Sequence, residues 1–158
     1  MASDPIDAVI RREGPETNDP DDSGGRTAFG ISEKSNPGAW ADNRVTDEEA
    51  RAIYEAKYVV GPGFLNIEHP RLREQLIDWG VNSGPSIAIQ GLQRVVGADV
   101  DGVLGPQTLA ALARHDERRV NNLVMVERIK MIGRILKKDP SQGKFVNGWL
   151  NRACEFVL

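Results

Sequence analysis

Carboxyl groups near the N-terminus have the types and spacing for acid–base chemistry. Glu13 ends a predicted helix, and Asp19, Asp21 and Asp22 follow in a segment rich in turn-forming residues. A carboxyl group at a helix C-terminus faces the negative end of the helix dipole, which disfavours its ionised form and raises its pKa. A carboxylate on an open loop stays ionised, so the two kinds of group could serve as the acid and base of a glycosidase. The same residues are common at helix ends that precede polar loops, and the spacing alone leaves a purely structural role open.

The helix that would position Glu13 is predicted over residues 5–13. Asp4 can cap this helix, Pro5 suits its first position, and apolar residues recur along one face. Residues 14–44 are rich in Gly, Pro, Asn, Asp and Ser and have no sustained period, which predicts turns with at most a short hairpin. Long irregular segments of this kind are usually functional or disordered.

The rest of the chain is predicted to be helical. Thr46 and Glu49 form a capping box for a helix over residues 46–58. Further helices are predicted to begin at Pro70, Pro85 and Pro106, to span 116–138, and to include Trp149. No run of alternating polar and apolar residues is long enough for a large sheet. The expected fold class is therefore mainly α, with about six or seven helices and a small irregular or hairpin lobe near the N-terminus.

Composition favours one globular domain without a metal or cofactor. The chain has 158 residues, of which 40% are hydrophobic and 27% charged. The single Cys154 has no disulfide partner within the chain, and we expect it to be a small buried apolar residue. His69 and His115 are the only histidines and belong to no metal-binding motif. The acidic front two thirds argues against nucleic-acid binding.

The net charge of −3 conceals an acidic front part and a basic back part. Residues 1–110 hold 10 Lys or Arg against 18 Asp or Glu, a net −8, whereas residues 111–158 hold 10 against 5, a net +5. The basic part is either a solvated helix face or a region with weak affinity for anionic wall or lipid surfaces. The first residues do not resemble a signal peptide, and no apolar run reaches the roughly 18 residues of a spanning helix.

The segment from Arg12 to Ile31 resembles the N-terminal signature of glycoside hydrolase family 108, which reads roughly E-G-G followed by N-D-P-x-D-x-G-G-x-T-x-Y/F-G-I. This family comprises phage endolysins and related bacterial proteins with N-acetylmuramidase activity and a lysozyme-like α fold. The resemblance implies the same fold and activity here, with Glu13 as the catalytic acid. The matching positions are Glu13, Gly14, Asn18, Asp19, Pro20, Asp22, Gly24, Gly25, Thr27, Phe29, Gly30 and Ile31.

Glu13, Asp22 and Thr27 are also similar to the phage-lysozyme triad E-x8-D-x5-T, although four residues rather than five separate Asp22 from Thr27. The resemblance implies that Asp22 and the Thr27 hydroxyl hold and activate a water while Glu13 protonates the leaving oxygen. Phe29 of the signature is a candidate substrate-binding residue. So is Asn82, because an amide can both donate to and accept from an acetamido group.

Two positions depart from the family pattern. Pro15 stands where the family has the second glycine of E-G-G, which removes a backbone donor and fixes φ beside Glu13. The chain reads Tyr58-Val-Val60 where a Tyr-Trp pair is common, so one candidate aromatic wall of a cleft is missing.

Segments 78–85, 88–97 and 100–109 are similar to the predicted peptidoglycan domain that follows in the same family. The phrase L-Q…V-D-G-x-x-G-P-x-T also looks like the repeat of small peptidoglycan-binding modules. The alternative is structural: a loop between helices and ordinary core positions would use the same residues. These residues are Gly102, Gly105 and Pro106 for the loop, and Trp79 and Leu92 for the core.

Together these features predict a monomeric peptidoglycan hydrolase that cuts the β-1,4 bond between N-acetylmuramic acid and N-acetylglucosamine. Its partner would be bacterial peptidoglycan, and we expect no cofactor, metal or nucleic acid. Within one lysozyme-like domain of residues 1–158, we expect 1–68 to be catalytic and 69–158 to resemble the peptidoglycan domain. As an endolysin, it would be made in the host cytoplasm without a signal peptide and reach the wall through a separate holin-like pore. The alternative is a non-catalytic peptidoglycan-binding or secretion-assisting protein.

Overall fold

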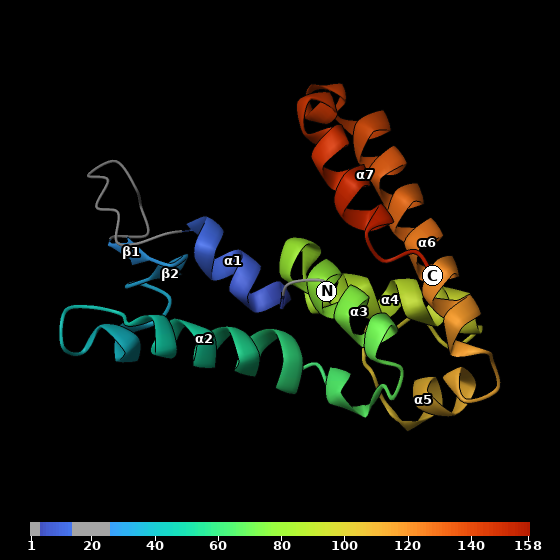
Figure 1. Cartoon of the computed structure of the whole chain (residues 1–158), viewed down its shortest axis with the longest axis horizontal. Coiled ribbons are helices and arrows are strands. Elements are labelled where there is room, and N and C mark those ends of the chain that lie inside the picture. The colour runs from blue at the N-terminus through green and yellow to red at the C-terminus, as the bar shows by residue number, and fades with distance from the viewer. Residues whose placement is uncertain (1–3, 14–25) are drawn as a thin grey trace. The chain divides into compact units, whose positions relative to one another are not determined.

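The described part of the chain is mainly helical, with one small hairpin near its start (Figure 1). The computed structural model describes residues 4–13 and 26–158. Its internal contacts divide the chain into a first unit, Met1–Lys57, and a second unit, Tyr58–Leu158. The prediction of a mainly α fold with a small hairpin lobe is confirmed.

Two short helices frame the first unit. Helix α1 spans Pro5–Glu13, with the Asp4 carboxylate accepting from the Ile6 amide at 2.9 Å. Helix α2 spans Asp47–Glu55 and begins with the predicted capping box. Helices α1 and α2 pack together, burying apolar residues of both. The predicted helix ends at residue 58, whereas α2 ends at Glu55. The chain passes there into the π-helical turn Ala56–Val60.

The hairpin of the first unit consists of two very short strands. Strand β1, Thr27–Ala28, pairs antiparallel with β2, Ile31–Ser32. The turn between them has positive φ at both central residues, 51° at Phe29 and 77° at Gly30. This combination is typical of a type I′ turn, whose twist matches that of the flanking strands. After the hairpin, the 3₁₀ helix Pro37–Trp40 leads toward α2.

The second unit consists of five α-helices and short connecting turns in its described residues. Proline occupies the first position of α3, α4 and α5, where its missing amide proton and fixed φ suit a helix start. Asp116 caps α6 by accepting from the Arg119 amide at 2.7 Å. The helices are α3 Pro70–Ser83, α4 Pro85–Val96, α5 Pro106–Leu112, α6 Glu117–Lys138 and α7 Val146–Cys154, and the 3₁₀ turns are Phe64–Asn66 and Pro140–Phe145.

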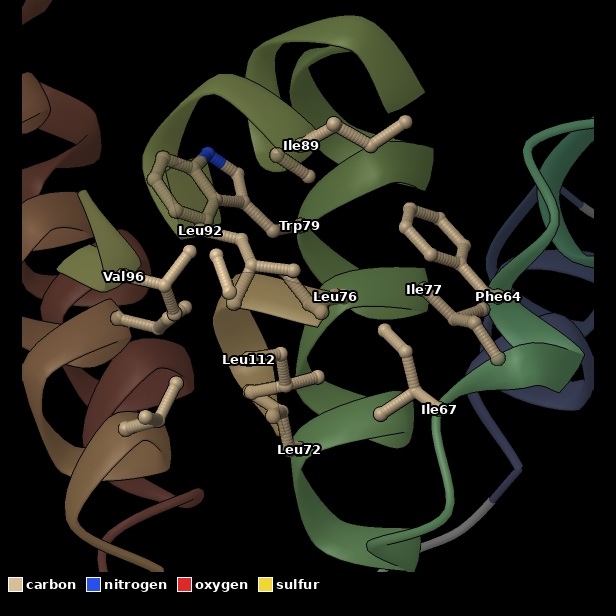
Figure 2. Packing of buried hydrophobic residues seen from close by; sticks show 14 residues of the cluster. Phe64, Ile67, Leu72, Leu76, Ile77, Trp79, Ile89, Leu92, Val96 and Leu112 are labelled. Atoms are coloured by element: carbon tan, nitrogen blue, oxygen red, sulfur yellow. The ribbon is translucent and has the colours of Figure 1, made fainter. Parts of the chain in front are cut away.

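The core of the second unit lies where α3, α4 and α6 pack together. Figure 2 shows the Trp79 indole of α3 lying over α4 beside Leu92, with Leu76 below it. Gly91 allows this approach, because a Cβ atom there would lie 2.4 Å from the indole. Trp79 and Leu92 are thus core residues, as the structural alternative predicted.

The expectation for Cys154 is wrong. Its side chain is exposed at the end of α7, whereas the neighbouring Ala153 is fully buried. A helix that packs one face against its partners leaves the adjacent position pointing outward. Cys154 therefore lies on the solvent side of α7.

Candidate functional site

The predicted catalytic acid occupies the end of α1. Glu13 is the last residue of this helix, as expected. The Glu13 side chain, Pro15 and Asp22 lie outside the described residues, so their predicted roles stay predictions. The chain re-enters the described region at Arg26, immediately before the predicted Thr27.

Thr27 and Phe29 both belong to the hairpin. Thr27 is the first residue of β1 and faces Ser32 across the ladder, and Phe29 occupies the turn. The Phe29 carbonyl accepts a hydrogen bond from the Tyr54 hydroxyl at 3.1 Å. Tyr54 is buried on α2, so this bond fixes the hairpin turn to the helix. A β-hairpin of two residues per strand has little stability of its own, and such a tether holds its geometry.

Arg26 braces the other end of the hairpin, a role that the sequence analysis did not predict. Its guanidinium lies over the Trp40 ring, 4.8 Å from the centroid, and its Nε donates to Glu33 Oε2 at 3.1 Å. Its Nη2 donates to Asn43 Oδ1 at 3.1 Å. The Trp40 indole in turn donates to the Ile31 carbonyl at 3.2 Å. Hydrogen bonding and charge from Arg26 hold the pKa of the Glu33 carboxyl below its ordinary value. Glu33 is therefore an ionised partner that holds the Arg26 guanidinium in place.

A hollow of about 430 Å³ opens beside the 3₁₀ helix and α2. Among the described residues that line it, Glu49 is the only carboxylate. Glu49 Oε2 already accepts from the Thr46 amide at 2.8 Å and from the Thr46 hydroxyl at 3.0 Å. Glu49 therefore serves as part of the cap of α2. The described residues that line the hollow provide no other carboxylate for acid–base catalysis.

Asn82, the other predicted sugar contact, belongs to the second unit. It is exposed near the end of α3, and its Nδ2 donates to the Asp78 carbonyl one turn earlier. The Asp78 carboxylate lies between two guanidinium groups, those of Arg128 and Arg152. Sequence reasoning missed this cluster, because its members are far apart in the chain and carry no local signature.

The phrase that resembles a peptidoglycan-binding repeat builds a loop around Gln93. This side chain is fully buried, and its Nε2 donates to Asp101 Oδ1 at 2.7 Å and to Thr108 Oγ1 at 3.1 Å. Its Oε1 accepts from the Gly102 amide at 2.9 Å. Gly102 has φ 76°, and a Cβ atom there would lie 2.1 Å from Ser86 Oγ. The conspicuous residues of the phrase therefore shape the loop between α4 and α5, as the structural alternative predicted.

Three further findings concern the described residues alone. The described residues contain no group of three or more His, Cys, Asp or Glu side chains arranged to hold a metal ion. His69 caps α3, with its Nδ1 accepting from the Leu72 amide at 3.3 Å. Within the same residues, no helix combines the length and apolar character needed to cross a membrane.

Comparison with known proteins identifies the class. Residues 6–84 match the family described as Glycosyl hydrolase 108, and residues 87–154 match the Predicted Peptidoglycan domain. The chain belongs to the glycosyl hydrolase 108 family and is a glycosidase that acts on peptidoglycan. It is similar to the solved structure of SagA from Brucella abortus, with a TM-score of 0.71 and 29% identity, covering 96% of this chain and 88% of that chain. No curated protein sequence matches it.

Proposed function

We propose that this protein is an N-acetylmuramidase that hydrolyses the β-1,4 bond between N-acetylmuramic acid and N-acetylglucosamine, with Glu13 as its general acid. The observation that carries the proposal is the position of Glu13 as the last residue of α1, inside the segment that matches the hydrolase family. The negative end of a helix dipole favours the protonated carboxyl group that a general acid needs near neutral pH.

Asp22 and Thr27 would handle the attacking water. A carboxylate accepts the proton of a water molecule, and a threonine hydroxyl can both donate and accept hydrogen bonds, so together they orient one lone pair toward the anomeric carbon. Thr27 starts a strand whose turn is fixed to α2 through Tyr54, which gives its backbone a defined position. Such positioning matters because acid–base catalysis requires the groups to be within hydrogen-bond reach of the reacting atoms.

Phe29 would contact the sugar rings. It is a partly buried aromatic residue with φ 51°, a region that side-chain-bearing residues seldom occupy. Such conformations persist only where the surroundings enforce them, and they cluster at functional sites. The Tyr54 hydroxyl bond to the Phe29 carbonyl supplies one such constraint.

The test is mass spectrometry of the products released from purified sacculi. New reducing ends on N-acetylmuramic acid support the proposal. Reducing ends on N-acetylglucosamine, or 1,6-anhydromuramic ends, would assign a different cleavage. Sacculus binding without any new ends would favour the non-catalytic alternative.

The matched variants are Glu13→Gln and Glu16→Gln. The first keeps the size of the side chain but removes the transferable proton, and general acid catalysis is typically worth about 10²–10⁴ in rate. The second changes a carboxyl group three residues along the chain, at a position that the family signature does not fix, and should keep near wild-type turnover. Near wild-type turnover by a folded Glu13→Gln variant would overturn the assignment of the acid.

A further inference from the structure

A small cavity in the second unit has a lining that suits an anionic ligand. It encloses about 160 Å³ at the end of α3, beside α6 and α7, which lie next to each other (Figure 1). A cavity of about 150 Å³ can hold a benzene molecule, so this one has room for a carboxylate with a short side chain. The lining residues are Asn82, Ser83, Arg128, Met131, Ile132, Ile135, Trp149 and Arg152.

Two guanidinium groups share one directly paired carboxylate beneath this cavity. Asp78 Oδ2 lies 2.7 Å from Arg128 Nη2, and Asp78 Oδ1 lies 2.6 Å from Arg152 Nη2 and accepts from Arg152 Nε at 2.7 Å. One carboxylate thus serves two guanidinium groups, and we call these three residues the Asp78 cluster. The exposed Glu155 also favours the charged form of Arg128 electrostatically. No neutralising partner for Arg152 other than Asp78 is found among the described residues.

Arg128 has an unused donor. The residue is only 4% exposed, and its buried Nη1 has no hydrogen-bond partner among the residues that the structure describes. Burial lowers the pKa of Arg128, and the neighbouring Asp78 opposes that shift. Guanidinium groups remain charged in proteins, so Arg128 places a buried cation beneath the cavity, although its Nη1 has almost no surface open to it. The more exposed Arg152 is the guanidinium group that a ligand in the cavity can reach.

The other lining residues limit which groups a ligand can carry beside its carboxylate. Met131, Ile132 and Ile135 of α6 form an aliphatic side, and Trp149 of α7 provides an aromatic face. Asn82 and Ser83 add neutral polar groups at the end of α3. A bare inorganic anion would leave the aliphatic wall unused, whereas a carboxylate that carries a methyl group and an amide would contact all three kinds of lining.

We propose that this cavity binds a carboxylate of the peptidoglycan stem peptide, of the kind found at a terminal alanine. The carboxylate accepts from the guanidinium of Arg152, which lines the cavity and is about 24% exposed, and the short side chain contacts Ile135 and Trp149. Planar guanidinium groups are well suited to carboxylates, and charge-assisted hydrogen bonds are about twice as strong as neutral ones. The proposal rests on peptidoglycan as the substrate, and it assigns the second unit a role in recognising the peptide rather than the glycan.

The test is binding of N-acetyl-D-alanine to the full chain, followed through the indole N–H signal of Trp149 in NMR spectra. A saturable shift is expected, with the carboxamide analogue binding about tenfold more weakly or worse, because it lacks the charge. No shift, or equal binding of the carboxamide, would overturn the proposal. So would equal affinity for inorganic phosphate, which would show a general anion site.

Two variants test the cavity by different means. Ile135→Trp fills it while keeping every residue of the Asp78 cluster, and Arg152→Met removes one of the two guanidinium groups while leaving Asp78 paired with Arg128. Both should weaken binding about tenfold or more. Their controls are Leu123→Trp and Arg118→Met, exposed positions on α6 outside the cavity, which should bind like wild type. Wild-type binding by a folded Ile135→Trp variant would place the ligand elsewhere.

Failure of this proposal is distinguishable from failure of the proposed function. The binding measurement involves no bond cleavage, whereas the assignment of Glu13 is tested by reaction products. Binding without N-acetylmuramidase products would overturn the proposed function alone. Those products without binding would overturn only the carboxylate site.

Discussion

Replacing Gly91 with alanine tests the contact that fixes α3 against α4. The new Cβ atom would lie 2.4 Å from both Cη2 and Cζ3 of Trp79. Carbon atoms pack at about 3.5–4.0 Å, so the indole or the helix must move by more than about 1 Å. Trp79 is only 1% exposed and is enclosed by the core of the second unit, which leaves little room for that movement.

The expected loss of stability follows from two opposing effects. Alanine is favoured over glycine inside a helix by roughly 0.5–1 kcal/mol. Overpacking a core typically costs about 1–3 kcal/mol and occasionally more. Because this overlap is deep and its partner is enclosed, the upper end applies, and the free energy of unfolding should fall by about 2 kcal/mol. At about 2–4 °C per kcal/mol for a chain of this size, Tm should fall by roughly 4–8 °C.

The control is Gly133→Ala in α6. A Cβ atom there meets nothing within 4 Å, so only the helix preference of alanine should act, raising stability by about 0.5–1 kcal/mol. Urea unfolding followed by circular dichroism and tryptophan fluorescence measures both variants, with coincident transitions justifying a two-state treatment. If Gly91→Ala is as stable as the wild type, the packing described for Trp79 is wrong.

Three further outcomes are expected. EDTA should leave turnover intact, because the proposed chemistry uses carboxyl groups; complete loss that zinc restores would indicate a metallohydrolase. Truncation after residue 115 should give an insoluble or molten product in solubility and near-UV measurements, because it removes the buried Val120, Val124 and Ile132, and a folded fragment would contradict this. The Val103 amide donates to Asp101 and, with Gln93, holds the pKa of Asp101 below the ordinary 3.8. The loop stabilisation from that bond should therefore be complete above pH 3.8 and be lost as the pH falls through the lower pKa of the folded state. The NMR signal of the Val103 amide reports this loss, and a change of that signal near neutral pH would contradict the assignment.

Helix starts were the features most readable from the sequence, because their signals are local. Pro70, Pro85 and Pro106 each open a helix as predicted, and the Thr46–Glu49 capping box forms. Each signal depends on residues within one turn, so no distant part of the chain needs to be known. The π-helical turn after α2 and the short 3₁₀ turns carry no comparable pattern.

Features made by distant residues could not be read in this way. Asp78 meets Arg128 and Arg152 only after α3, α6 and α7 have packed, and a single sequence does not say which charges will pair. Gln93 is a second case: the phrase around it resembles a binding repeat and lies in the segment that matches the peptidoglycan domain, but its sequence does not reveal that this glutamine is fully buried and organises a loop. The turn at Phe29 was predicted only as part of a short hairpin, because positive φ at a phenylalanine is uncommon.

Helix α3 makes the two family segments dependent on each other. It lies within residues 6–84, which match the hydrolase family, yet its buried Leu72, Leu76 and Trp79 pack in one core with α4 and α6 from the segment that matches the peptidoglycan domain. Each such large apolar side chain contributes roughly 1.5–3 kcal/mol when fully buried. The same later segment supplies Arg128 and Arg152 to the Asp78 carboxylate. The boundary between the two matches therefore falls inside a single core, and α3 can hold Asp78 and present Asn82 only when the later helices are folded against it.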